Sequence, residues 1–271
     1  MSKGYHIVVC GGIVPDPLQR LEPVSTPSGP ALRNEMMLPA VLDPWAASAL
    51  YEAAALAKKM PESKVWLVAA GPKAKLQQVM MVTGQKVPFE LVAIDAPAGG
   101  FTESFAVAGL LAAAIKSIPG LDYSRLLVFG GWESASRGAG STLQAVGELL
   151  EISAQFQGVD ELAVAEDGSF TVLERVEGGR HQVSKCSAAP AVLGWATGNL
   201  AEPPNNPQVG MANMRAIMPA LQKAKAEKLS AEGLSFQHVA LPAEQRETRI
   251  VKDTPVDVIA NEIVDWLRGA N

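Results

Sequence analysis

The chain has 271 residues, of which 48% are hydrophobic and 19% charged, a balance typical of a folded protein with a substantial core. Its formal net charge of -5 argues against a surface for nucleic acid or anionic lipid, because such surfaces need dense positive charge. Two cysteines are too few for a disulfide framework, and no stretch approaches the roughly 18 apolar residues of a membrane span. We therefore expect a cytoplasmic protein with protein or small-molecule partners, which neither binds nucleic acid nor inserts into a membrane.

The first half of the chain alternates strand-like and helical patterns. Short apolar runs predict strands at residues 5–10, 65–70, 90–94 and 126–129. Apolar residues at helical spacing predict helices at about residues 44–60, 73–83, 102–118 and 141–151. Asp43 is suited to cap the first of these helices, with Pro44 at its first position, and Gly84 is suited to end the second. Such alternation predicts an α/β fold in which helices flank a Rossmann-like parallel sheet.

The pattern changes after residue 157. Three strand-like runs joined by Gly-containing turns predict a small antiparallel meander at residues 161–166, 170–176 and 180–185. Residues 191–195 predict one more strand of the main sheet. Residues 198–208 contain three prolines and predict an exposed loop, after which a helical pattern runs from Met211 to near Leu229.

The C-terminal part has a different character. Residues 233–252 look extended, and an amphipathic helix follows, with Pro255 at its first position and with Thr254 and Asp257 as a variant of a capping box. We therefore divide the chain into an α/β domain at residues 1–232, to which the glycine-rich turn described next assigns nucleotide binding, and a C-terminal arm and helix at residues 233–271. The apolar face of that helix is expected to pack on a partner subunit, so the chain should be stable as a heterodimer.

A glycine- and serine-rich turn lies between the strand at 126–129 and the helix that starts near Ser141. Glycines let the backbone approach an anion, and the first-turn N–H groups of a helix point outward with a partial positive charge. No lysine follows in the order G-x-x-x-x-G-K-[ST], so the turn is suited to hold a phosphate rather than to split one. The alternative is an ordinary turn whose glycines only make room for packing.

The sequence offers no evident catalytic or metal-binding group. Its three histidines, His6, His181 and His238, lie far apart, and the nucleophile-elbow and zinc-protease motifs are missing. The expected loops at the carboxyl ends of parallel strands are instead where open α/β sheets bind ligands. Trp45 and Trp132 belong to such loops and are suited either to stack on a ring or to anchor the core.

Several short motifs follow one another in a fixed order: Asp43-Pro44-Trp45-Ala46, Ala70-Gly71-Pro72, Glu177-Gly178-Gly179, Pro190-Ala191-Val192 and Asn213-Met214-Arg215. In this order they resemble the β subunit of electron transfer flavoproteins over nearly the whole chain. The resemblance implies a fold similar to that of adenine nucleotide α-hydrolases and an electron carrier rather than an enzyme. In that family the α subunit carries the redox FAD, and the β subunit helps to form its site and holds AMP or, in bifurcating members, a second FAD.

The resemblance also implies which residues bind. Carried over by position, the nucleotide lies against Val9, Asp43, Pro44, Trp45, Ala46, Ala70, Gly130, Trp132, Gly138, Ala139, Gly140 and Ser141. The loop that docks on flavin-dependent dehydrogenases falls between Glu202 and Arg215, with Met211 as its apolar anchor. The implied electron acceptor is a quinone oxidoreductase.

The chain departs from the family pattern at three places. Gly11 replaces a common lysine, Glu174-Arg175 reverses a common Arg-Glu pair, and residues 134–136 replace acidic residues of the nucleotide turn. Because the turn lacks the acidic pattern of bifurcating members, we favour AMP over a second FAD. Two other classes remain open, namely a stand-alone regulatory module that binds an adenine nucleotide and an enzyme of the nucleotide α-hydrolase group.

Overall fold

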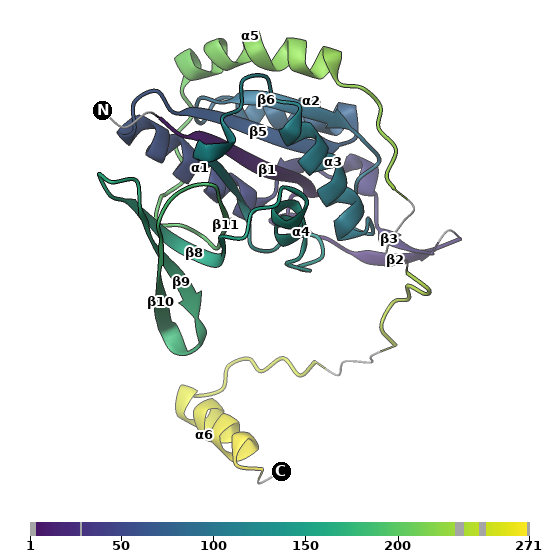
Figure 1. Cartoon of the computed structure of the whole chain (residues 1–271). Coiled ribbons are helices and arrows are strands. Elements are labelled where there is room, and N and C mark those ends of the chain that lie inside the picture. The colour runs from purple at the N-terminus through teal and green to yellow at the C-terminus, as the bar shows by residue number, and fades with distance from the viewer. Residues whose placement is uncertain (1–3, 28, 231–235, 244–247, 270–271) are drawn as a thin grey trace.

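A twisted sheet of mostly parallel strands, with helices on both faces, forms the centre of the protein (Figure 1). The computed structural model describes residues 4–27, 29–230, 236–243 and 248–269. Within these ranges the sheet has nine strands, eight of them in the order β10-β9-β8-β11-β7-β1-β5-β6, while β4 pairs with β1. The predicted Rossmann-like α/β fold is confirmed.

The elements follow the predicted alternation. The central parallel strands are β1 (His6–Pro15), β5 (Lys64–Gly71), β6 (Glu90–Asp95), β7 (Leu126–Gly131) and β11 (Ala191–Trp195). The helices are α1 (Pro44–Lys59), α2 (Lys73–Thr83), α3 (Ser104–Lys116), α4 (Thr142–Leu149), α5 (Pro207–Lys223) and α6 (Val256–Leu267). In the described part of the chain, no helix combines the length and the apolar character that crossing a bilayer requires.

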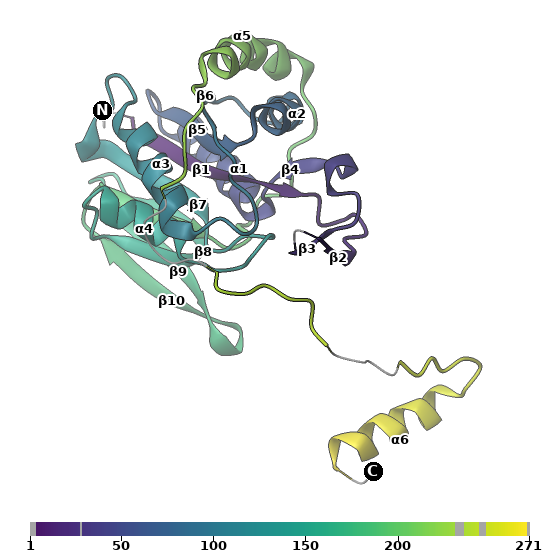
Figure 2. The same ribbon diagram turned by 90° about the vertical axis from the view of Figure 1, so that its right-hand side faces the viewer.

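The sheet separates two apolar clusters. Helices α1, α2 and α5 lie on one face and α3 and α4 on the other (Figure 2), and their side chains belong to the first and the second cluster respectively. Alternation along β1 divides its residues between the faces: Ile7 and Val9 belong to the first cluster, and Val8 and Cys10 to the second. Central strands buried on both faces read as continuous apolar runs, which is why the sequence predicts them well.

The segment between β1 and α1 has structure that the sequence patterns do not predict. Strand β1 continues to Pro15 because Ile13, Val14 and Pro15 pair with β4 (Ala40–Leu42) in antiparallel register. Strands β2 (Pro23–Thr26) and β3 (Gly29–Leu32) form a separate two-stranded sheet, followed by a short 3-10 turn. The segment between β1 and α1 thus contains three short strands.

The predicted meander consists of β8 (Gln155–Val164), β9 (Phe170–Val176) and β10 (Arg180–Cys186). It continues the main sheet, because β8 also pairs with β11 in parallel register. The Asp160 carboxylate holds the three strands together, accepting hydrogen bonds from Arg175 Nε and Nη2 at 3.0 and 2.7 Å and lying 2.9 Å from His181 Nε2. Burial raises the pKa of Asp160, but these hydrogen bonds outweigh burial and hold it below its ordinary value.

Helix α5 begins earlier and ends earlier than the sequence predicts. It starts at Pro207, inside the predicted loop, because the Asn206 side chain accepts hydrogen bonds from the amides of Gln208 and Val209. It ends at Lys223 rather than near Leu229. The helix lies beside α2 and covers the edge of the sheet at β6 (Figure 2).

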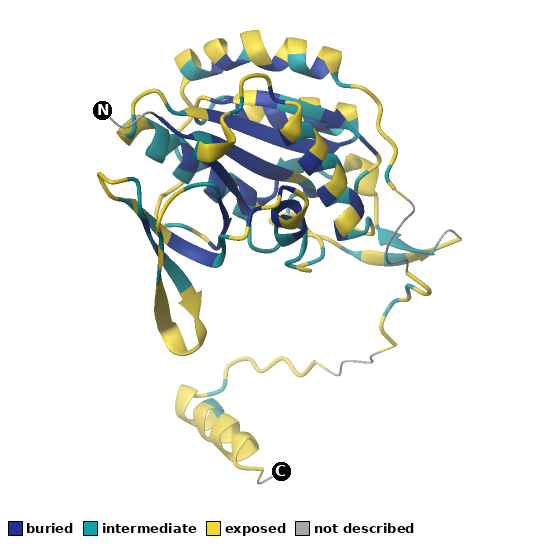
Figure 3. Cartoon of the chain, viewed as in Figure 1, coloured by how far each residue is buried: buried dark blue, intermediate teal, exposed yellow. Residues whose placement is uncertain are grey.

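The predicted C-terminal helix is present as α6, but its predicted capping is wrong. Pro255 occupies the N-cap position, where it has no side-chain hydrogen bond, and Thr254 Oγ1 instead donates to the Lys252 carbonyl at 3.4 Å. No residue of α6 is buried (Figure 3). The predicted extended stretch, residues 233–252, lies partly outside the described residues. The division into two domains therefore stays a prediction.

Asn213 fixes α5 to the rest of the fold, which leads to a first prediction. Its buried side-chain amide donates to the carbonyls of Gly84 and Val87 at 2.7 and 2.8 Å, beyond the end of α2. Asn213→Ala leaves both buried acceptors unpaired, so the free energy of unfolding should fall by about 1–3 kcal/mol in urea denaturation. Gln208→Ala, a change of an exposed side chain on the same helix, is the control and should cost less than about 0.5 kcal/mol. Equal stability of the two variants would contradict the anchoring role.

Candidate functional site

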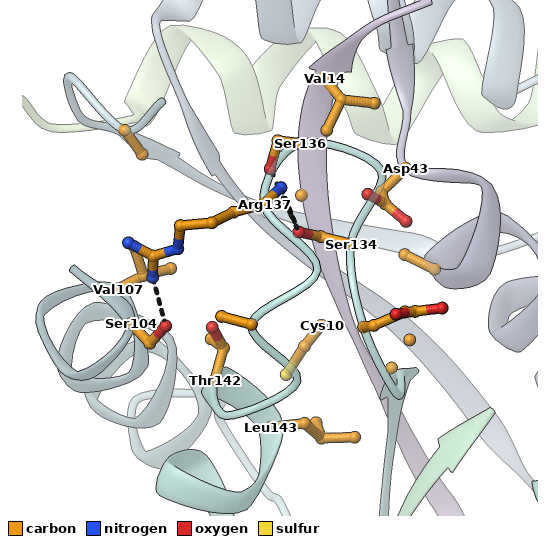
Figure 4. A pocket seen from close by; sticks show the side chains of 18 of the residues that line it. Cys10, Val14, Asp43, Ser104, Val107, Ser134, Ser136, Arg137, Thr142 and Leu143 are labelled. Atoms are coloured by element: carbon orange, nitrogen blue, oxygen red, sulfur yellow. Dashed lines mark hydrogen bonds between the residues drawn. The ribbon is translucent and has the colours of Figure 1, made fainter. Parts of the chain in front are cut away.

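A cleft opens where β1, β5 and β7 end, at the edge of the sheet that open α/β folds use for ligands (Figure 4). Its empty volume is about 970 Å³, a figure that includes space open to solvent. Its walls come from the end of β1, the starts of α1 and α3, the loop before α3 and the turn between β7 and α4. The turn that the sequence predicts as a phosphate cradle is therefore one wall of a real cleft.

The turn has the backbone geometry of an anion-binding concavity. Gly138 and Gly140 both have φ +63°, while Ala139 between them lies outside the left-handed region. Such alternation makes successive N–H groups converge. The amides of Ala139, Gly140 and Ser141 donate no hydrogen bond within the described part of the chain, and α4 begins directly after them. These three amides and the first turn of α4 are the donors available to a phosphate.

Gly138 corrects one detail of this cradle. Its amide donates to the Ser134 carbonyl at 2.9 Å and so closes the turn internally. Gly138 also does not line the cleft. The amides without an internal partner therefore begin at Ala139.

Asp43 joins the start of α1 to the same turn. Its Oδ1 accepts from the Trp45 amide at 3.1 Å, as predicted for a cap, and its Oδ2 accepts from the Ala135 amide at 2.8 Å. The side chain is buried. Burial raises the pKa of the Asp43 carboxyl, although the hydrogen bonds from Ala135 and Trp45 oppose the rise. Both oxygens are thus occupied in shaping the cleft wall.

Two glycines of β7 serve close packing beneath the cleft. A Cβ on Gly131 would lie 2.6 Å from the Cβ of Trp45, and a Cβ on Gly130 would lie 3.0 Å from Leu143 Cδ1. A larger residue at 131 would push the turn away from α1. For these two positions the packing alternative considered from the sequence is the one the structure supports, and both still line the cleft.

The cleft brings together eight of the twelve predicted nucleotide-binding residues. They are Asp43, Ala46, Ala70, Gly130, Trp132, Ala139, Gly140 and Ser141. The other four, Val9, Pro44, Trp45 and Gly138, do not line it. Val9 points into the apolar cluster under α1, on the opposite side of β1 from Cys10. The role of all twelve in binding stays a prediction.

The lining also includes polar residues that sequence reasoning missed. Arg137 reaches from the turn to the start of α3, where its Nη2 donates to Ser104 Oγ at 2.5 Å (Figure 4). Ser134 and Ser136, whose hydroxyls lie 3.1 Å apart, and Thr102 add further hydroxyl groups. An arginine inside a Gly- and Ser-rich turn was the available signal in the sequence, whereas its pairing with Ser104 required the fold.

The predicted docking residues lie on the outer side of α5 and on the loop before it. Met211 and Arg215 are exposed, and Met218 continues the same stripe at helical spacing. Glu202 is 2.7 Å from Lys86 Nζ in an ion pair. The predicted docking segment is thus a loop followed by a helix, and the helix begins at Pro207 rather than at Met211.

The chain carries no histidine site of the catalytic kind in its described residues. His6 Nδ1 accepts from the Asp122 amide at 3.2 Å, and His181 faces Asp160 in the meander. No group of three or more His, Cys, Asp and Glu side chains in the described ranges is arranged to hold a metal ion.

One comparison with known proteins identifies a relationship. The family model described as "Electron transfer flavoprotein domain" matches residues 34–232 of the 271. The matched region runs from the end of the loop after β1 to beyond α5, so it includes the cleft turn and the predicted docking helix. No curated protein matches the chain.

Separating the two roles of Asp43 leads to a second prediction. Asp43→Ala removes both hydrogen bonds, whereas Asp43→Ser retains a cap for the Trp45 amide but cannot reach Ala135 as well. We expect the free energy of unfolding to fall by about 2–4 kcal/mol for Ala and by about 1–2 kcal/mol for Ser. Lys58→Ala, at the exposed far end of α1, is the control. If Asp43→Ala and Asp43→Ser lower the free energy of unfolding equally, the hydrogen bond with the Trp45 amide that Ser can retain does not contribute to stability.

Proposed function

Because the chain belongs to the electron transfer flavoprotein family, we propose that it is the β subunit of a heterodimeric electron transfer flavoprotein. Proteins of this family are flavin-associated electron carriers rather than enzymes. The proposed role is to help form the site of a FAD carried mainly by an α subunit, to bind AMP structurally, and to dock on a dehydrogenase. The family match carries this proposal, since it spans both the cleft turn and α5.

The cleft residues fit an adenine nucleotide. A phosphate needs several N–H donors, which the free amides of Ala139, Gly140 and Ser141 supply together with the first turn of α4. Small residues at the strand ends, including Ala70 and Gly130, leave space for the nucleoside. No lysine stands in the turn to activate a leaving phosphate, so the nucleotide is proposed to stay intact.

The C-terminal helix supports a partner subunit. Val256, Trp266 and Leu267 are 81%, 69% and 71% exposed, which is unfavourable for large apolar side chains in water. A helix with such a face needs an apolar surface to cover it. We propose that the α subunit supplies that surface, which also places the flavin site close to this chain.

The outer side of α5 supports the docking role. The stripe of Met211, Arg215 and Met218 combines flexible apolar side chains with a cation, the kind of surface that fits another protein. Its base is rigid, because Asn213 is bonded to two carbonyls and Asn206 caps the helix. We propose that a flavin-dependent dehydrogenase binds here and that a quinone oxidoreductase accepts the electrons, in the cytoplasm.

Two other functions differ in what the cleft holds or in whether a partner is needed. A bifurcating flavoprotein would hold a second FAD where we propose AMP, but Ser134, Ala135 and Ser136 replace the acidic pattern expected in that turn. A stand-alone regulatory module would not need the exposed apolar face of α6. Both observations favour the heterodimeric carrier with AMP.

The composition of the purified protein tests the proposal. We expect the chain to co-purify with a second subunit and a yellow flavin, and acid extraction followed by chromatography should yield one FAD and one AMP per heterodimer. Two FAD per heterodimer would indicate a bifurcating protein. An absence of any adenine nucleotide besides the single FAD would refute the phosphate cradle, and a stable monomer without flavin would favour the regulatory module.

The docking surface gives a separate prediction. Met211 is 65% exposed on α5 and makes no core contact, so Met211→Ala should slow electron uptake from the dehydrogenase by about tenfold with little change in flavin content or thermal stability. Met36→Ala is the matched control, because Met36 is a 96% exposed methionine in the turn before β4. A parallel loss of flavin would make Met211 structural. Equal slowing by Met36→Ala would show that the effect is not specific to α5.

A further inference from the structure

The charge of the cleft depends on Arg137. Among the described residues that line the cleft, Arg137 is the one basic side chain, whereas Asp43 and Glu133 are acidic. The oxygens of Asp43 already accept hydrogen bonds from the amides of Trp45 and Ala135. A phosphate in the cleft therefore meets two carboxylates and a single guanidinium, which makes that cation important for binding an anion.

The guanidinium of Arg137 is fixed from the side of α3. Its Nη2 donates to Ser104 Oγ at 2.5 Å, and Ser104 is only 3% exposed. The start of α3 is itself rigid, because the Glu103 carboxylate caps it by accepting from the amides of Phe105 and Ala106 at 2.7 and 3.1 Å. The remaining guanidinium N–H groups make no other hydrogen bond within the described chain and are available to a ligand.

A residue of the C-terminal arm covers the same guanidinium. The Arg137 Cζ atom lies 5.7 Å from the ring centroid of Phe236, within the range of a cation–π contact. The Phe236 ring also packs edge-on against Phe101, with centroids 5.9 Å apart and planes at 85°. Phe101 lies between Gly100 and Thr102, two residues of the cleft wall. Phe236 thus contacts one residue of the cleft lining, Arg137, and the neighbour of two others, Phe101.

We propose that Arg137 is the phosphate-binding side chain of the cleft and that Phe236, from the C-terminal arm, is a positioning residue for it. Arg137 lies in the same turn as the amides of Ala139, Gly140 and Ser141, separated from the first of them only by Gly138, so the cation and the amides belong to one anion site. Ser104 holds one edge of the guanidinium and Phe236 covers its face. This inference rests on the proposed nucleotide function and adds a charged ligand and a second segment of the chain to that site.

Competition binding to the full chain, in the complex in which it co-purifies, tests the proposal. Labelled AMP is displaced by unlabelled AMP or by adenosine, which lacks the phosphate. Arg137→Gln should lower the affinity for AMP about 10- to 100-fold, the usual effect of a lost hydrogen bond between two charged groups. The affinity for adenosine should change less than about twofold. Arg137→Lys should fall between wild type and Gln, because it keeps the charge but not the planar fork.

Phe236→Ala should lower the affinity for AMP about two- to fivefold, in the range of an exposed cation–π contact, and leave the affinity for adenosine unchanged. The control is Phe105→Ala, since Phe105 is similarly exposed, at 56% against 51%, and adjoins Ser104 without lining the cleft. In the Arg137→Gln background, Phe236→Ala should have no further effect on AMP, because the two residues act together.

The outcomes separate this inference from the proposed function. Unchanged AMP affinity in Arg137→Gln would overturn the inference while the nucleotide site remains. Equal weakening of AMP and adenosine would also overturn it, because Arg137 would then only shape the cleft. Failure of the wild-type complex to bind AMP would contradict both.

Discussion

The buried carboxylate of Asp43 is the constraint on which the cleft depends. It joins the first turn of α1 to the turn after β7, two segments that are 92 residues apart in sequence. Burial raises its pKa and opposes its charge, and the amides of Ala135 and Trp45 compensate for that cost. This carboxylate therefore helps to fix the start of α1 relative to the turn that leads to residues 139–141.

Close packing below Asp43 extends the same constraint. Gly131 lies so near Trp45 that no side chain fits there, and Gly130 leaves room for Leu143 at the start of α4. The strands below are buried on both faces, so they form a stiff base for the turns at their ends. A rigid base and turns of small residues give free amides a defined direction, which is what recognition of a phosphate by backbone groups requires.

The regular elements can be predicted from the sequence because their apolar residues recur at the spacing of the buried face. The bounds of α2, β9 and β11 match the predicted ones, since both ends are marked by Pro, Gly or a change of periodicity. The short strands β2, β3 and β4 were missed because exposed or half-buried strands of three or four residues leave little pattern. The start of α5 was missed because Asn206 and Pro207 read as loop residues, although they form a cap and a first turn.

The site was predictable only in part, for a different reason. The turn with its free amides could be recognised from local glycines, whereas the contacts of Arg137 with Ser104 and Phe236 join positions 33 and 99 residues away, which no local pattern records. Phe236 also belongs to the arm that leads to α6, the helix whose apolar face is uncovered. If the arm binds a partner through α6 and the nucleotide through Phe236 and Arg137, any change that one binding event makes in the affinity for the other ligand is matched by the same factor in reverse, because linkage is reciprocal. If the proposed nucleotide orders the arm and so lowers the entropy cost of docking α6 on a partner, it strengthens assembly of the proposed heterodimer without taking part in electron transfer.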